Sequence, residues 1–197
     1  MYIFIAIPFL FCIAFSSLQA QSDTVHKKFN TYEELEQMKD SAQIDVLTYI
    51  DSTLGYSVVF PDWLTLQETG TPKFMGGTLP AVRGIENAIV IKGFYKSEFP
   101  SFDDFKDYVI LGSTVGSPPQ WNDEMTFMGM TSLGTFEEIG PSYKTYLMWK
   151  GKMYHCQYVL AETSGGYLWI DFTATEETYN TNLVKLREFL STFALIE

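Results

Sequence analysis

The sequence predicts a single α+β domain over residues 44–197, an antiparallel β-sheet covered by helices on both faces. Three observations predict it. Tight turns at 150–151 and 164–166 join runs of alternating apolar residues, a pattern typical of β-hairpins. Two segments, 101–111 and 175–193, combine capping residues with helical spacing of apolar residues. Both faces of the C-terminal strands are largely apolar, as expected for a sheet covered on both sides.

The composition is that of an acidic globular protein. The chain has 197 residues, a net charge of −11 and 46% hydrophobic residues, while only 19% are charged. Disordered chains are less apolar and more highly charged, and nucleic-acid binders normally carry a basic stripe. We therefore expect a folded domain that binds no nucleic acid.

Residues 1–20 have the pattern of a signal peptide. They contain no Asp, Glu, Lys or Arg, are apolar from Met1 to Phe15, and end in small and polar residues at Ala20. The apolar run is shorter than the roughly 20 residues that a membrane-spanning helix needs. We expect cleavage after about Ala20, export to the periplasm or the extracellular space, and no integral membrane segment in the mature chain. The alternative is a retained membrane anchor.

The N-terminal half alternates short helices and strands. Residues 21–43 form a polar leader and a short helix, which begins at a capping box of Thr31 and Glu34. Strands are then expected at 46–50, 56–60, 63–67 and 87–94, with a long loop rich in Gly and Pro at 69–84. Ser101 and Asp104 open the helix that extends to residue 111, and a second loop follows at 112–119.

The C-terminal half is a succession of strands closed by a helix. Strands are expected at 125–130, 135–139, 143–149, 153–162 and 167–173. Thr175 caps the last helix, whose apolar stripe is Tyr179, Leu183, Leu186, Leu190 and Phe193. Internal repeats and linkers are absent from the sequence, which favours one domain.

Alternation along the strands sorts their side chains onto two faces, because hairpin partners share a face. One face, named here the aromatic face, holds Tyr143, Thr145, Leu147, Trp149, Tyr154, Cys156, Tyr158, Leu160, Tyr167, Trp169 and Asp171. The other face holds Tyr146, Met148, Met153, His155, Val159, Leu168, Ile170 and Phe172. We expect the last helix to cover one of the two.

The aromatic face is the candidate ligand site. Rings that surround a carboxylate are what a small-molecule or carbohydrate site uses. The predicted ligand-binding residues are Tyr143, Tyr158, Trp169 and Asp171. The alternative is that the same rings form core beneath a helix.

The sequence predicts no catalytic residue, metal site or cofactor. His155 and Cys156 are neighbours on one strand and point to opposite faces, so they cannot easily form a nucleophile–base pair. His155 and Asp171 are likewise on opposite faces. The two histidines, His26 and His155, lie far apart, and no phosphate-binding, dinucleotide or nucleophile-elbow motif occurs. Cleavage of the signal peptide removes Cys12 and leaves Cys156 as the single thiol, so no internal disulfide is expected.

Three lysines, Lys144, Lys150 and Lys152, cluster around one predicted hairpin. They suit an acidic partner or lipid headgroups, or alternatively protect an exposed hairpin from edge-to-edge pairing. The sequence leaves both uses open.

Two segments resemble PsbP-like domains. The strand Gly55–Pro61 with Trp63 after it resembles their opening hairpin, and Tyr167–Thr173 with the following helix resembles their ending. The resemblance covers about residues 44–197. Members of this superfamily include exported bacterial DcrB-like and PsbP-like domains of unknown function. It implies an α/β/α sandwich that acts as a binding or assembly module, although fold alone does not determine function.

These observations predict an exported, non-enzymatic protein that binds a protein partner or assembles at the cell envelope. Two alternatives stay open. One is a small-ligand binder that uses the aromatic face, and the other is a hydrolase whose site has no recognisable motif.

Overall fold

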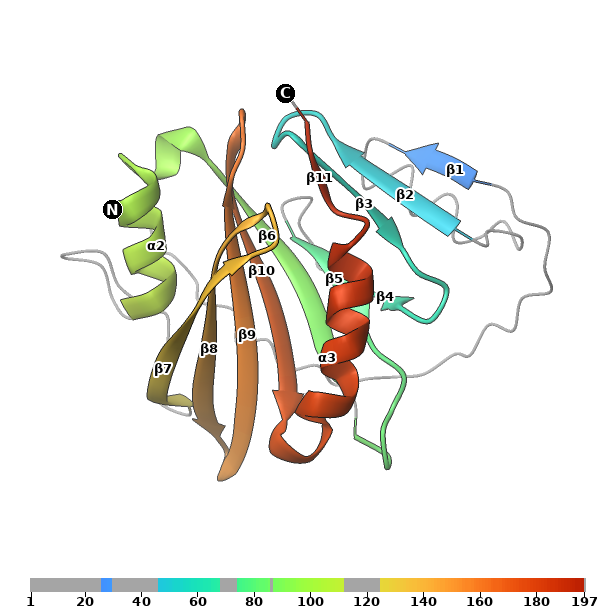
Figure 1. Cartoon of the computed structure of the whole chain (residues 1–197), viewed down its shortest axis with the longest axis vertical. Helices are drawn as coiled ribbons and strands as arrows, with labels where there is room; N and C mark the ends of the chain where they lie inside the picture. Colours follow the sequence, from blue (N-terminus) through green and yellow to red (C-terminus); the bar gives the residue numbers. More distant parts are fainter. Residues whose placement is uncertain (1–25, 30–45, 68–73, 86, 112–124, 197) are drawn as a thin grey trace.

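A computed structural model describes residues 26–29, 46–67, 74–85, 87–111 and 125–196 (Figure 1). Residues 1–20, the predicted helix that begins at the Thr31 capping box and the predicted loop at 112–119 lie outside the described residues. Among the described residues, none of the helices has the length and apolar character needed to cross a membrane.

The described residues form an α+β fold, with a large antiparallel sheet, a small sheet and two α-helices. The large sheet has seven strands in the order β4 (Thr65–Leu66), β5 (Phe74–Thr78), β6 (Ala88–Tyr95), β10 (Gly166–Thr175), β9 (Lys152–Glu162), β8 (Gly140–Trp149) and β7 (Met125–Phe136). The small sheet has the order β1 (His26–Phe29), β2 (Val46–Asp51), β3 (Tyr56–Phe60) and β11 (Ala194–Leu195). The helices are α2 (Phe102–Leu111), α3 (Glu176–Leu190) and the short 3₁₀ turn η1 (Lys96–Glu98).

The register predicted across the turn at 150–151 is confirmed. Leu147 pairs with Tyr154 and Thr145 pairs with Cys156 between β8 and β9. Both residues of the turn between these strands, Lys150 and Gly151, have positive φ, at 50° and 75°. Two-residue hairpin turns that match strand twist require this backbone conformation.

The first strands do not join the large sheet, although a single sheet was expected. The hairpin of β2 and β3 forms a separate sheet, in which β11 pairs with β3 through Ala194 and Ser57. Local patterning cannot reveal this pairing, because the two strands lie at opposite ends of the domain sequence. Residues 26–29, expected to belong to a polar leader, pair in parallel with β2 as β1.

The predicted loop at 69–84 contains a strand, so that prediction is wrong for its central part. β5 pairs with β4 on one side and with β6 on the other. A Cβ atom on Gly76 would lie 2.2 Å from the carbonyl oxygen of Ile89, and one on Gly77 would lie 2.2 Å from that of Thr65. These glycines therefore permit close approach of neighbouring strands, and do not mark a loop.

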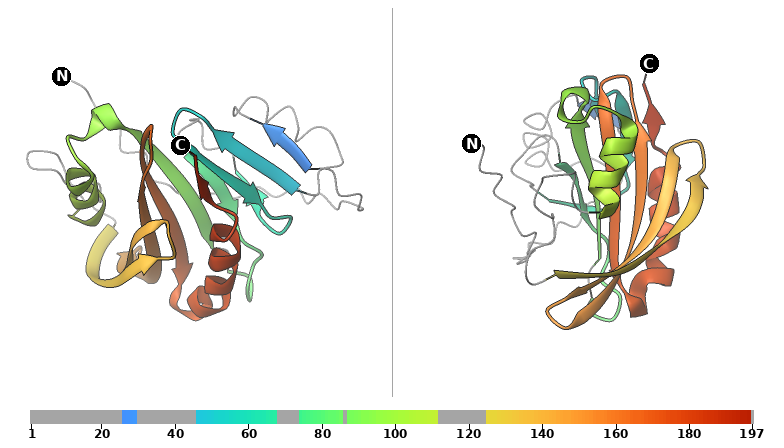
Figure 2. Two further views of the ribbon diagram at one scale, coloured as in Figure 1. Left: turned by 45° about the horizontal axis from the view of Figure 1, so that its top comes forward. Right: turned by 90° about the vertical axis from the view of Figure 1, so that its left-hand side faces the viewer.

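β7 is one long strand where two strands were predicted, at 125–130 and 135–139. Its pairing with β8 is interrupted by two bulges, one after Phe127 and one after Ser132. Bulges bend a strand and increase its twist. The end of β7 curls toward α3 as a result, as the right-hand view of Figure 2 shows.

Two clusters of buried side chains lie on the large sheet. One joins α3, through Leu186 and Phe189, to Leu168 and Ile170 of β10 and to the small sheet. The other joins α2, through Phe105 and Val109, to Tyr167 and Trp169 of β10 and to β8 and β9. Successive residues of β10 thus alternate between the cluster of α3 and the cluster of α2.

The predicted helix starts differ in how they are capped. Ser101 accepts a hydrogen bond from the Asp104 backbone N–H, which confirms the predicted cap of α2. Thr175 stands at the N-cap of α3, but its hydroxyl is hydrogen-bonded to the Thr178 hydroxyl and to no backbone group of the helix.

Candidate functional site

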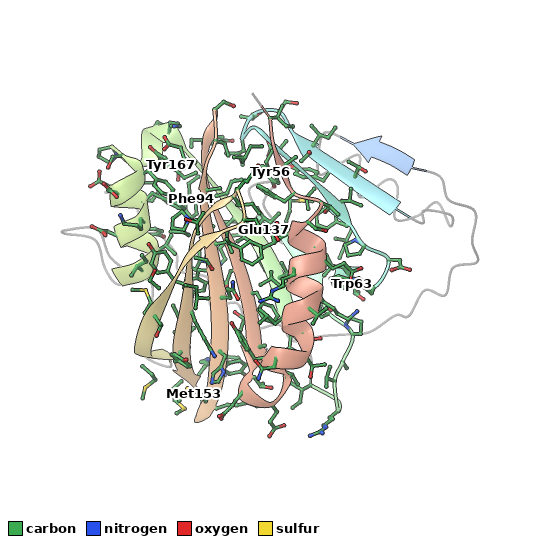
Figure 3. All side chains as sticks on the ribbon, viewed as in Figure 1. Tyr56, Trp63, Phe94, Glu137, Met153 and Tyr167 are labelled. Carbon is green, nitrogen blue, oxygen red and sulfur yellow. The ribbon has the colours of Figure 1, made fainter. Side chains whose placement is uncertain are left out.

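The aromatic face is packed beneath α2. Tyr158 and Trp169 are only 1% and 4% exposed, and both belong to the cluster that contains Phe105. The ring of Tyr167 stacks on that of Phe105 with centroids 5.2 Å apart, and Figure 3 shows Tyr167 beside α2. Of the four residues predicted to bind a ligand, Tyr143 and Asp171 are half-buried and the other two are core.

Asp171 already has a cationic partner. The Nζ atom of Lys92, on the neighbouring strand β6, lies 2.8 Å from Asp171 Oδ2 and 3.6 Å from the centroid of the Trp169 ring. The Thr173 hydroxyl donates a hydrogen bond to Asp171 Oδ1. The carboxylate is therefore neutralised within the protein, and sequence reasoning missed Lys92 as its partner.

The structure separates His155 from Cys156, as the alternation of strand residues predicts. Cys156 is a buried free thiol 3.3 Å from the Thr173 hydroxyl, in the cluster beneath α2. The imidazole of His155 lies on the other side of the sheet, with its ring centroid 5.6 Å from that of Tyr179. Burial raises the pKa of the Cys156 thiol to about 12, so the nucleophilic thiolate is scarce at neutral pH.

An open groove of about 420 Å³ lies on the side of the sheet that faces α3, and we name it the α3 groove. Strands β7, β8 and β9 and helix α3 contribute its walls. Its lining residues are Leu133, Thr135, Phe136, Ser142, Lys144, Gln157, Tyr179, Asn180, Leu183 and Arg187. None of these is a carboxylate.

The floor of the α3 groove is a buried chain of polar side chains. The Tyr179 hydroxyl donates to Gln157 Oε1 at 3.2 Å, and Gln157 Nε2 donates to Ser142 Oγ at 3.1 Å. All three residues are buried. Burial raises the pKa of Tyr179 to about 12, so its phenol stays neutral and can donate this hydrogen bond. The floor is therefore rigid and polar without carrying charge.

Two cations stand on opposite walls of the α3 groove. Lys144 is half-buried on β8, with its Nζ atom 4.4 Å from the centroid of the Tyr179 ring, and Arg187 is exposed on α3. Within the described part of the chain, neither cation forms an ion pair. The pKa of His155 is lowered, first by burial and then by the charge of Lys144.

Each wall follows from local periodicity. Tyr179, Leu183 and Arg187 are four residues apart and form one stripe along α3. Ser142 and Lys144 alternate along β8, and Gln157 of β9 pairs directly with Lys144. The parity that placed Tyr146 and His155 on this face applies equally to these three polar residues. Sequence reasoning missed them because it sorted mainly the apolar side chains.

No family model matches the chain, and no curated protein matches it. Three similar solved structures are a PsbP of the cyanobacterium Synechocystis, a protein of unknown function from Pseudomonas aeruginosa and the Ran-binding protein Mog1p of Saccharomyces cerevisiae. Their sequence identities are 11%, 13% and 8%, with TM-scores of 0.46, 0.44 and 0.41. The matches cover 77%, 75% and 73% of this chain and 92%, 94% and 91% of the other chains, in the same order.

Proposed function

We propose that this chain is an exported, non-enzymatic binding protein whose small-ligand site is the α3 groove. One observation carries the proposal: an open groove of about 420 Å³ with a buried polar floor, apolar wall residues and two cations that lack carboxylate partners among the described residues. Small-molecule sites have this combination of volume, apolar lining and a few polar groups. Export rests on the uncharged apolar pattern of residues 1–20. The proposal includes a PsbP-like α/β/α arrangement, which the separate clusters of α2 and α3 support.

The α3 groove is a better site than the aromatic face. A ligand on Tyr158 or Trp169 would have to displace side chains that are packed against them, and close packing makes such displacement costly. In the α3 groove the lining side chains already border open space. The proposal therefore keeps the small-ligand function and moves its site to the other face of the sheet.

The described residues support binding better than hydrolysis. The buried thiol of Cys156 has a raised pKa and lies away from His155, and Asp171 is paired with Lys92. Within the described ranges, no group of three potential metal-ligating side chains occurs. A hydrolase would need an activated nucleophile next to a base or a metal ion.

A protein partner at the cell envelope is the second candidate, and one observation favours it. β7 is the last strand of the large sheet among the described residues and exposes three apolar side chains, Met128, Met130 and Leu133. Exposed edge strands pair readily with strands of other chains.

Fragment screening by NMR on the full mature chain tests the groove proposal. We expect a subset of small compounds to shift the amide resonances of groove residues, and Leu183→Trp to abolish those shifts by filling the groove. Tyr158→Phe, on the aromatic face, serves as the control and should leave them unchanged. Shifts confined to the aromatic face, or hits unaffected by Leu183→Trp, would contradict the proposal.

A further inference from the structure

We propose that the ligand of the α3 groove is an amphiphilic anion, in which an acidic head is attached to an apolar chain. This inference rests on the proposed function and adds the chemical class of the ligand. It follows from the charge of the groove, from the placement of its apolar wall and from the hydrogen bonds that the polar groups of the floor already make with one another.

The head of the ligand is assigned by the two cations. Lys144 on β8 and Arg187 on α3 approach the groove from opposite walls, and none of the described residues that line it is a carboxylate. Both charges also act on Tyr179 between them: Lys144 Nζ lies over its ring, and Arg187 opposes the rise of its pKa. In a chain of net charge −11, such a site attracts anions only at short range, where the two lining cations act most strongly.

The tail of the ligand is assigned by the apolar wall. Leu133 and Phe136 of β7 and Leu183 of α3 line the same groove, and Leu133 is 48% exposed. The bulge after Ser132 turns this end of β7 toward α3, so these side chains stand next to the cations. An apolar chain laid along them removes their surface from water, at about 25 cal/mol for each Å² buried.

Other ligand classes fit the α3 groove less well. A cation would meet Lys144 and Arg187 without any lining carboxylate to neutralise it. A sugar would stack on an aromatic face, but Lys144 Nζ already stands over the ring of Tyr179 at 4.4 Å. The amide and hydroxyl groups of Gln157 and Ser142 are bonded to each other. An anion with an apolar tail uses the remaining groups of the groove, which are the two cations and the apolar wall.

Calorimetric titration with three probes of equal chain length tests the inference: decanoate and decyltrimethylammonium below their critical micelle concentrations, and decan-1-ol below its solubility limit. We expect decanoate to bind at least about tenfold more tightly than decan-1-ol, because a charged hydrogen-bond pair contributes roughly 1.5–3 kcal/mol. The decyltrimethylammonium cation should bind most weakly. Affinity for decanoate should fall as salt is raised.

Charge variants locate the head. Lys144→Met and Arg187→Gln should each weaken decanoate binding about fivefold to tenfold and leave decan-1-ol binding unchanged. Lys152→Gln is the matched control, because it removes the same charge from the exposed first residue of β9, outside the groove. Circular dichroism should show all three variants folded.

The outcomes separate the two proposals. Equal affinity for decanoate and decan-1-ol, with both lost in Leu183→Trp, would overturn the anionic class and keep the groove as the site. Binding that Leu183→Trp leaves unchanged, or no binding of any probe together with no fragment shifts, would overturn the groove itself. A loss in Lys152→Gln as large as that in Lys144→Met would show only a general effect of net charge and would refute the assigned head site.

Discussion

The side of the seven-stranded sheet beneath α2 and the side beneath α3 are built from the same strands but differ in what fills them. Beneath α2, rings from α2, β6, β10 and the segment before α2 pack against one another, with Phe105 in contact with Phe94, Phe99 and Tyr167. Beneath α3, the helix and the small sheet cover only part of the surface and leave the α3 groove beside β7. The side of the sheet with the most aromatic residues is therefore the closed side. The ligand site is proposed on the other side, where α3 and the small sheet no longer cover the strands.

The two sides of the sheet also differ in whether their charged side chains are paired. The carboxylate beneath α2, Asp171, is paired with Lys92, while among the described residues the groove cations Lys144 and Arg187 have no carboxylate partner. A pair of opposite charges inside the protein helps to maintain the fold, since the loss of one partner leaves the other charge without compensation. Unpaired cations at the edge of a groove remain available to a ligand.

Removal of the central ring beneath α2 should have the largest effect on stability. Phe105→Ala deletes a fully buried ring that contacts four others, so we expect the free energy of unfolding to fall by about 3–5 kcal/mol. Urea denaturation measures it. The matched change on the open side, Leu133→Ala, should cost less than about 1 kcal/mol because Leu133 is exposed. Equal losses would remove the distinction between the two sides.

Breaking the ion pair beneath α2 should have the next largest effect. Asp171→Ala leaves the Lys92 ammonium, 16% exposed, without its carboxylate, and we expect a loss of about 1–3 kcal/mol. The double variant with Lys92→Met should recover part of that loss in a double-mutant cycle. Lys144→Met in the groove should change stability by less than about 0.5 kcal/mol, because it breaks no ion pair among the described residues. A cycle with no coupling between Lys92 and Asp171 would contradict this.

Loss of the phenol on the groove floor should have a smaller effect. Tyr179→Phe removes the hydrogen bond to Gln157 Oε1 and leaves this buried acceptor unsatisfied, so we expect a loss of about 1 kcal/mol in thermal or urea unfolding. Tyr146→Phe removes the same atom from a half-buried ring of the same face and serves as the control. An equal loss in both variants would show that the buried hydrogen bond has no special weight.

Ionisation of the thiol beneath α2 should have the smallest effect, because it changes stability only at high pH. Burial raises the pKa of Cys156 from 9.0 to about 12, so the folded chain favours the protonated thiol. A raised folded-state pKa contributes stability that is fully present below pH 9 and is lost as pH rises toward 12. We therefore expect iodoacetamide to leave native Cys156 unmodified at pH 8 and to modify it in urea. Rapid labelling of the native chain would place this thiol in an open site.

The sequence predicted most of the secondary structure and the sorting of the C-terminal strands. Tight turns and alternation were enough to pair Leu147 with Tyr154 and to separate His155 from Cys156, because both depend only on neighbours along the chain. The strand at 74–78 was missed, since Gly76 and Gly77 are common in loops and their close contacts come from distant strands. The pairing of β11 with β3 was missed for the same reason.

By itself, the sequence determined which side chains share a face, including Ser142, Lys144 and Gln157 of the groove, because alternation is a property of the extended backbone. It did not determine which face is closed. That depends on where α2 and α3 pack and where the bulged end of β7 turns, and these positions arise from contacts between segments far apart in the chain. Tertiary structure thus placed the aromatic residues beneath α2 and left the groove beside α3 open, since one helix is too narrow to cover four strands.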